Sequence, residues 1–331
     1  MYTSDFPEVV HQADCPHNEA GREIQFRTMC TECGGIVCFA DDSTYTVSAS
    51  DTAELSYKLS QKFQVMADYL TENRLCINTD KTHLLVLCPE QKKRYIDTQA
   101  VKLTTATEVI SPTSTEKLLG YTVHQNLGFG EYLLHGKNSV LSSITKRVGA
   151  FKKISRIASF KTRLSVCTSL VMSKILYMLP LFSGCPDYML AALQTKLNEA
   201  MRIVTKRKWE VLGLRLTSTK ELLKQCGYLS VRQMASYHSI STVHKTIQNK
   251  QPEYLYQVLT EALRSGVHHR YPTTQAASRQ VKAARLATAN SSFRWRAASQ
   301  YSQLPPTLQN EPSLDIFNSK LKEHTRRKVM I

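Results

Sequence analysis

The segment IVCFADDSTYTVS, residues 36–48, holds the most informative pattern in this 331-residue chain. Residue types that favour strands flank Asp41-Asp42-Ser43, and Asp and Ser favour turns. The pattern therefore predicts two short strands around a tight turn. Two adjacent carboxylates at a hairpin tip cannot be buried without a compensating cation. The turn is either a solvated acidic loop or a site for Mg²⁺ or Mn²⁺, which prefer oxygen ligands.

The residues that follow, 52–73, have the spacing of an amphipathic helix. Thr52 is its predicted N-cap, and Asn73 or Asn78 marks its exit. Apolar residues recur at intervals of three or four and define one face: Leu55, Leu59, Phe63, Met66 and Leu70.

Farther along the chain, strands are predicted at 83–88 and near 118–123, and the pattern becomes helical from residue 132. Large aliphatic residues are sparse in 265–300, which predicts a basic, weakly ordered segment. Helices are predicted at 137–156, 162–179 and 187–205, with two shorter ones inside 217–262 and a last one containing Leu314, Phe317 and Leu321.

This order predicts an α+β protein with three parts. Residues 1–131 form a small mixed part, 132–262 a helical part, and 263–331 the basic segment with a C-terminal helix.

Charge is unevenly distributed over the chain. Residues 1–50 hold eight acidic and two basic residues, a balance of −6. Because the whole chain has a net charge of +16, the other 281 residues carry +22. Such a basic field favours nucleic acid first, and an acidic membrane or protein next. The sequence shows no apolar run long enough to span a bilayer and no signal-peptide pattern. The nine cysteines fit no small secreted scaffold, so we expect an intracellular protein, nuclear or cytoplasmic.

Three blocks, in this order, resemble the reverse transcriptases of non-LTR (LINE-type) retrotransposons. Phe-Ala-Asp-Asp at 39–42 is similar to the aspartate motif of the polymerase palm, Asn-x-x-Lys-Thr at 78–82 to the next palm motif, and Leu-Gly at 119–120 to the primer-grip hairpin. Tyr2–Pro7 and Leu304–Leu321 also resemble flanking stretches of that family. The resemblance covers residues 1–131 well, the tail in part, and the helical middle only by composition. It implies a partial palm followed by a helical thumb.

The resemblance also implies roles for single residues. Asp41 would be a metal ligand, and Asp42 a second ligand or an electrostatic partner, in two-metal nucleotidyl transfer. Lys81 would face the incoming deoxynucleoside triphosphate, as a charge neutraliser or a proton donor, unless it is an ordinary surface lysine. Leu119 and Gly120 would shape the primer grip, unless they form an ordinary strand and turn. The implied partner is an RNA or DNA primer–template.

The family places a further catalytic aspartate and the fingers before the segment that corresponds to Tyr2. We therefore expect the 331-residue chain alone to be inactive. It would be either a truncated or degenerate copy of a retrotransposon or the product of a gene model that begins at an internal methionine. Two alternatives are a nucleic-acid-binding module without chemistry and a host-recruited interaction protein that keeps the fold without the site.

A cysteine-rich segment near the N-terminus is a candidate zinc loop. Cys30-x-x-Cys33 is followed by two glycines, and Cys15 or His17 could supply the remaining ligands, with Cys38 as another choice. The alternative is a set of reduced cysteines in an irregular loop.

The predicted helix at 137–156 joins an apolar stripe to a dense set of cations. The stripe consists of Leu141, Ile144, Val148, Phe151 and Ile154. The candidate contacts to phosphate groups are Lys146, Arg147, Lys152 and Lys153. The alternative is a bundle helix with an ordinary solvated face.

Overall fold

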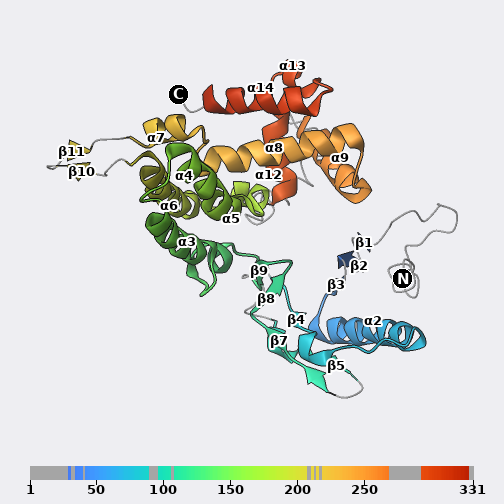
Figure 1. Cartoon of the computed structure of the whole chain (residues 1–331). Coiled ribbons are helices and arrows are strands. Elements are labelled where there is room, and N and C mark those ends of the chain that lie inside the picture. Colours follow the sequence, from blue (N-terminus) through green and yellow to red (C-terminus); the bar gives the residue numbers. More distant parts are fainter. Residues whose placement is uncertain are drawn as a thin grey trace. The chain divides into compact units, whose positions relative to one another are not determined.

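The structure is a computed structural model, and it describes residues 29–30, 34–39, 42–88, 96–105, 108–206, 210–211, 214–215, 218–267 and 292–327. Contacts divide the chain into two compact units, Met1–Gly128 (unit 1) and Phe129–Ile331 (unit 2) (Figure 1). The described part is mostly helical with small sheets, which confirms the mixed fold class. None of its helices is long and apolar enough to cross a membrane.

Unit 1 contains the predicted acidic hairpin. Strands β1 (Met29–Cys30), β2 (Gly34–Phe39) and β3 (Asp42–Thr46) form an antiparallel sheet in the order β1-β2-β3. The prediction of two strands within 36–48 is therefore confirmed. Phe39, the last residue of β2, is 63% exposed.

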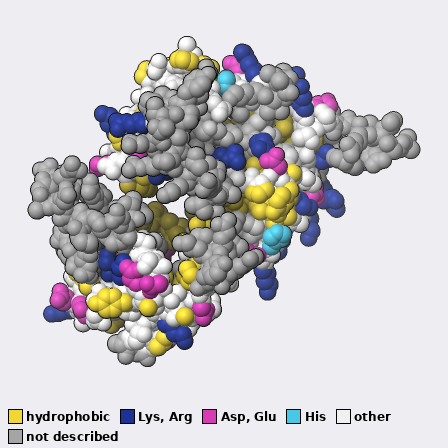
Figure 2. Space-filling view, turned by 180° about the vertical axis from the view of Figure 1, so that it is seen from behind, with side chains coloured by type: hydrophobic (Ala, Val, Ile, Leu, Met, Phe, Trp, Pro, Cys, Tyr) yellow, Lys and Arg dark blue, Asp and Glu magenta, His cyan; other side chains and the backbone are white. Residues whose placement is uncertain are grey.

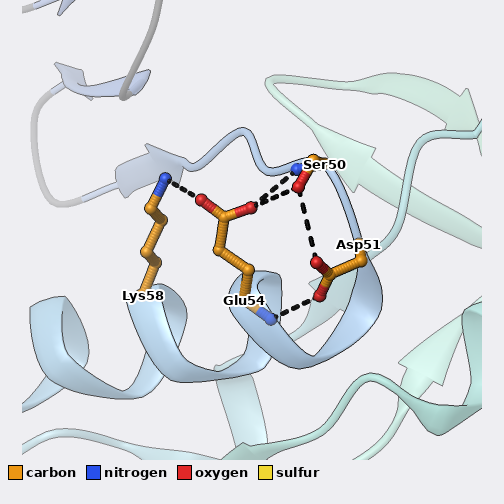
Figure 3. A network of polar contacts seen from close by, with 4 residues as sticks. All are labelled: Ser50, Asp51, Glu54 and Lys58. Atoms are coloured by element: carbon orange, nitrogen blue, oxygen red, sulfur yellow. Dashed lines mark hydrogen bonds and ion pairs between the residues drawn. The ribbon is translucent and has the colours of Figure 1, made fainter.

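Helix α2 (Thr52–Glu72) follows the hairpin, as the spacing predicts. Its N-cap is Asp51 and not Thr52, because the Asp51 carboxylate accepts the Glu54 N–H at 2.8 Å (Figure 3). Its C-cap is Asn73, one of the two exits that the pattern predicts.

Two small apolar clusters join α2 to its neighbours. In one cluster, Tyr69 packs with Ile36 of β2, and Tyr45 of β3 lies against this pair. In the other, Phe63 packs with residues that follow α2 in the chain: Leu84, Val86, Val101 and Leu103. Helix α2 therefore packs against both the hairpin and the later strands of unit 1, and Met66 contacts both clusters.

The strands after α2 are shorter than predicted. The expected strand at 83–88 is only β4 (Leu84–Leu85), which pairs in parallel with β7 (Pro112–Thr113). The expected strand at 118–123 is a hairpin of β8 (Thr115–Leu118) and β9 (Tyr121–His124). The remaining short elements are η1 (Thr79–Lys81), η2 (Thr98–Ala100), and the antiparallel pair β5 (Leu103–Thr104) and β6 (Val109–Ile110).

Unit 2 begins with helices that match the sequence pattern closely. Helix α6 (Asp187–Thr205) has the predicted bounds and buries the predicted residues Leu190, Leu193, Leu197, Met201 and Val204. Before it come η3 (Glu131–His135), α3 (Val140–Ile154), α4 (Phe160–Cys167), η4 (Thr168–Met172), α5 (Ser173–Leu176) and η5 (Leu179–Gly184). The run from α4 to α5 is continuous, and η4 is a wider π-helical turn within it.

The second half of unit 2 corrects two predictions. Three helices, not two, lie around 217–262, and Phe293–Ser302 is helix α12 rather than weakly ordered chain. The elements are β10 (Glu210–Val211), β11 (Leu214–Arg215), α7 (Thr219–Cys226), α8 (Val231–Asn249), α9 (Glu253–Val267), α12, α13 (Pro306–Gln309) and α14 (Leu314–Arg327).

One core joins α8, α9, α12 and the C-terminal helices. Phe317 and Leu321 of α14 are fully buried in it, as the pattern predicts, and pack with Val243, Leu259 and Tyr301. Tyr301 of α12 is therefore a core residue.

Candidate functional site

The acidic hairpin displays Asp42 at its closed end. Phe39 pairs with Asp42 in the last position of the ladder, so Ala40 and Asp41 connect the strands, and both lie outside the described residues. The Asp42 side chain is exposed, beside the start of β3. A carboxylate in this position has the oxygen atoms and the access to solvent that a divalent cation requires.

The opposite end of the hairpin is firmly held. The Thr46 hydroxyl donates to the Gly35 carbonyl and accepts the Gly35 N–H, each at 3.0 Å. Ile36 is buried, and the Lys62 ammonium of α2 lies 5.7 Å from the centre of the Tyr45 ring. The hairpin is thus fixed at its base while Asp42 faces solvent at its tip.

The Asn-x-x-Lys-Thr block forms a self-capped turn. The Asn78 side chain accepts the Lys81 N–H at 3.2 Å, and the Thr82 hydroxyl donates to the Asn78 carbonyl at 2.9 Å. These bonds involve the side chains of Asn78 and Thr82 but only the backbone of Lys81. The Lys81 side chain is exposed. Among the described residues, Lys81 forms no ion pair with Asp42 or with any other carboxylate.

Leu119 and Gly120 form the two-residue connection of the β8–β9 hairpin. Both have a positive φ, 47° for Leu119 and 80° for Gly120, as the tight turn between twisted strands requires. Glycine adopts this conformation easily, whereas leucine does so at a cost of about 1–2 kcal/mol. The predicted primer-grip residues therefore lie at the tip of a hairpin, where the backbone of Leu119 is strained.

Helix α3 separates the predicted cationic contacts into two kinds. Lys146, Lys152 and Lys153 have exposed side chains. Arg147 is half-buried, and its Nη1 donates to the Leu170 carbonyl at 2.9 Å, within the π-helical turn η4. Arg147 therefore ties α3 to η4, and only the three lysines are directed to solvent.

The stripe along α3 is largely as predicted. Ile144, Val148 and Phe151 are buried, together with Val140, but Ile154 is 55% exposed. Between residues 132 and 186 the chain has nine basic and no acidic residues. Figure 2 shows Lys and Arg side chains that project singly from the surface of the molecule. Unit 2 thus presents cations on helices with little neutralising charge nearby in sequence.

The predicted zinc loop lies largely outside the described residues, which include none of Cys15, His17 and Cys33. Only the backbone of Cys30 is described, and it pairs with Gly34 in the β1–β2 sheet. Among the residues that the structure places, no group of three or more His, Cys, Asp or Glu side chains forms a metal cluster. Both metal sites, zinc and magnesium, stay predictions.

Buried cysteines in unit 2 are structural. Cys167 is fully buried, and burial raises the pKa of its thiol to about 12. Cys226 is also buried, and burial raises the pKa of its thiol to about 11. Thiols in this state are poor nucleophiles and metal ligands.

Arg163 is the residue that sequence reasoning missed. Its side chain is buried, its Nε donates to the Val204 carbonyl at 2.8 Å, and its Nη1 donates to the Ala158 carbonyl. A signal for it exists, because Arg163 occupies the position before Cys167, Val171 and Ile175 in a buried stripe with a period of four. A cation in an apolar stripe indicates a role within the fold.

Comparison of the whole chain with protein-family models, with curated proteins and with solved structures found no match.

Proposed function

We propose that the chain is the C-terminal part of a reverse-transcriptase-like polymerase of the non-LTR retrotransposon type. Unit 1 would be the end of the palm with the primer grip, and unit 2 a thumb that binds the primer–template backbone. The observation that carries the proposal is the tight β2–β3 hairpin, anchored on α2 at its base, with an exposed aspartate at its tip. Such a frame displays carboxylates outside the apolar core without loss of rigidity.

In this proposal, Asp41 and Asp42 would hold Mg²⁺ or Mn²⁺, which supplies charge stabilisation for nucleotidyl transfer. The exposed Lys81 side chain, fixed at its backbone by Asn78, would contact the triphosphate. The β8–β9 hairpin would present Leu119 and Gly120 to the primer. The possible zinc site at Cys15, His17, Cys30 and Cys33 would stabilise the segment before the hairpin.

Binding of nucleic acid is tested by fluorescence anisotropy with labelled duplexes at several salt concentrations. The parent chain is expected to bind non-specifically with a Kd of about 10⁻⁴–10⁻⁶ M, and log affinity falls linearly with log salt. Combined replacement of Lys146, Lys152 and Lys153 by Ala lowers the slope by roughly 0.9 for each phosphate contact removed. A matched variant replaces the exposed Lys220, Lys224 and Lys322 of other unit 2 helices and should keep the parent slope.

The metal site is tested by affinity cleavage. Fe²⁺ bound in place of Mg²⁺ generates hydroxyl radicals in the presence of ascorbate and peroxide, and these cut the chain close to the ion. Cleavage near residue 42 that disappears in Asp41→Asn and Asp42→Asn supports the palm. Cleavage that the two variants leave unchanged contradicts it.

Primer extension distinguishes an intact site from a partial one. We expect no template-dependent incorporation by the 331-residue chain alone, because the family's reaction also uses an aspartate from an earlier segment. Incorporation that Asp41→Ala abolishes would show this expectation to be wrong.

The same experiments separate the two alternatives. A nucleic-acid-binding module without chemistry would give the salt-dependent binding and no cleavage near residue 42. An interaction protein that keeps only the fold would give neither. Residues 132–186 contain basic but no acidic residues, which complements a polyanion. This charge favours the nucleic-acid-binding module over the interaction protein.

A further inference from the structure

The turn between α3 and α4 exposes apolar side chains. Ile157 is 99% exposed, Ile154 55% and Phe160 44%. Burying an aliphatic side chain stabilises a protein, and the full exposure of Ile157 forgoes that gain. Large apolar residues grouped in this way are typical of a surface that receives a partner.

The exposure of Ile157 belongs to a turn that is held on both sides. Before it, Ser155 is buried, and its hydroxyl donates to the Lys152 carbonyl at 3.0 Å. After it, the buried Arg163 donates to the Ala158 carbonyl and, across unit 2, to Val204 at the end of α6. Ile157 is therefore presented by a rigid support, which lowers the entropy cost of inserting it into a partner.

Exposed basic residues flank this apolar tip in the sequence. Lys152, Lys153, Arg156 and Lys161 are exposed, and the nearest acidic residues in sequence are Glu131 and Asp187. The surrounding charge therefore complements a polyanion rather than a neutral or basic surface.

The cationic surface also extends along α3 away from the tip. Lys146, Gly149, Ala150 and Lys153 share one exposed face by their helical spacing. A Cβ atom added at Gly149 would meet nothing within 4 Å, so the face between the two lysines is smooth and open. Lys146 and Lys153 are seven residues apart, about 10 Å along the helix axis.

From this arrangement we infer that the α3–α4 turn is a wedge that enters the groove of a nucleic-acid duplex. Ile157, flanked by Ile154 and Phe160, inserts against a base step, and Lys153 and Lys146 contact successive phosphates behind it, along α3. This inference rests on the proposed function and adds how the helical unit contacts a duplex. Apolar wedges between basic contacts unstack and kink DNA in the same manner.

A lipid surface would also attract an apolar tip ringed by cations. The elongated face favours the duplex, because a tip that dips into a bilayer does not use a second lysine two helical turns farther along α3. A phosphate backbone does, since its charges continue along both edges of the groove.

The test combines binding with a probe of base stacking. A DNA duplex that carries 2-aminopurine gains fluorescence when a neighbouring base step opens. The parent chain is expected to raise this fluorescence, and Ile157→Ser should remove the rise and weaken binding on the order of tenfold. The matched control is Ile316→Ser, which changes a 48% exposed isoleucine of α14 and should keep both signals.

The outcomes separate the two proposals. If Ile157→Ser retains the parent fluorescence and affinity, the wedge is wrong while salt-dependent binding, and with it the thumb, still stands. If the parent chain binds no duplex, the proposed function itself fails. Vesicles of phosphatidylcholine and phosphatidylserine in equal parts provide the third arm. Vesicle binding that depends on Ile157, without duplex unstacking, would overturn the wedge in favour of a membrane contact.

Discussion

Units 1 and 2 bury their apolar residues in different ways. In unit 1, α2 is the single long helix of the described residues, and short strands pack against it through two small clusters. In unit 2, helices pack against helices, and the C-terminal core alone joins α8, α9, α12, α13 and α14. The candidate catalytic residues lie in unit 1, which has only small apolar clusters. The candidate binding surface lies in unit 2, which has the larger core.

The largest expected effect is on the core of unit 2. Phe317 is fully buried and stacks on His244 with ring centres 3.6 Å apart. Phe317→Ala should lower the free energy of unfolding by about 3–5 kcal/mol, because it leaves a cavity in a helical core. Both tryptophans, Trp209 and Trp295, lie in unit 2, so intrinsic fluorescence during urea unfolding measures the change.

The partner variant for this measurement is Phe63→Ala, which opens the core of unit 1. If the units unfold separately, this variant speeds hydrogen exchange in α2 and leaves the fluorescence transition in place. A fluorescence transition that shifts equally in both variants would show that the two units unfold as one.

A second, smaller effect concerns Arg163. Arg163→Met keeps the aliphatic stem but leaves the buried carbonyl of Val204 without its donor, at about 1–3 kcal/mol, and also removes the bond to the half-buried Ala158 carbonyl. Because Ala158 belongs to the α3–α4 turn, duplex binding should weaken as well. Arg156→Ala removes an exposed cation from the same turn and should weaken binding without changing urea unfolding.

The same contrast explains which parts of the fold could be predicted. Helix α6 was predicted to the residue because its buried positions repeat every three or four residues within a single element. The strand expected at 83–88 shrank to two residues because its partner, β7, lies 28 residues away, and no local pattern specifies that pairing. Helix α12 was missed because two of its three buried residues, Ala297 and Ala298, carry little hydrophobic signal.

The site was predictable in part for a similar reason. The hairpin at Asp42 and the cap at Asn78 follow from residue types within a few positions. The role of Arg147 does not, because the carbonyl it binds belongs to a π-helical turn 23 residues later. Burial of Arg163 and exposure of Ile157 likewise arise from the way helices meet, which sequence periodicity alone does not give.

A third effect depends on pH and involves His244 in unit 2. Its side chain is fully buried, with Nδ1 3.2 Å from the Tyr301 hydroxyl, and burial lowers its pKa below 6.5 against a weaker opposing influence of Glu311. The unfolded chain therefore binds the proton more readily than the folded chain. Stability should be retained above pH 6.5 and fall as the pH drops below it, by up to about 1.4 kcal/mol per pH unit from this group. Urea unfolding of His244→Gln should show a shallower loss over that range, and an unchanged slope would contradict the prediction.

The smallest effect lies at the start of α2. There, a polar network of Ser50, Asp51, Glu54 and Lys58 joins the segment after the hairpin to the first turns of the helix (Figure 3). Asp51→Ala removes the N-cap and should cost about 1 kcal/mol, measured as faster hydrogen exchange in the first turn of α2. Ser230→Ala removes the corresponding cap of α8 in unit 2 and provides the matched comparison.

The caps of α2 and α8 differ in one titratable group, because only the cap of α2 includes a carboxylate at the third helical position, Glu54. Hydrogen bonds from Lys58 first, and then from the Ser50 N–H and hydroxyl, lower its pKa from 4.5 to about 2. The network should therefore be complete above pH 4.5 and be lost as the pH falls toward 2, and salt should weaken it because the side chains are exposed. In Glu54→Gln, exchange in the first turn of α2 should no longer respond to pH over that range. The cap of α8 contains Gln233 in place of a carboxylate, so its exchange should not respond in the parent chain either. If the two first turns instead lose protection together on acidification, the cause is global unfolding, and the local network is not what positions the acidic hairpin on α2.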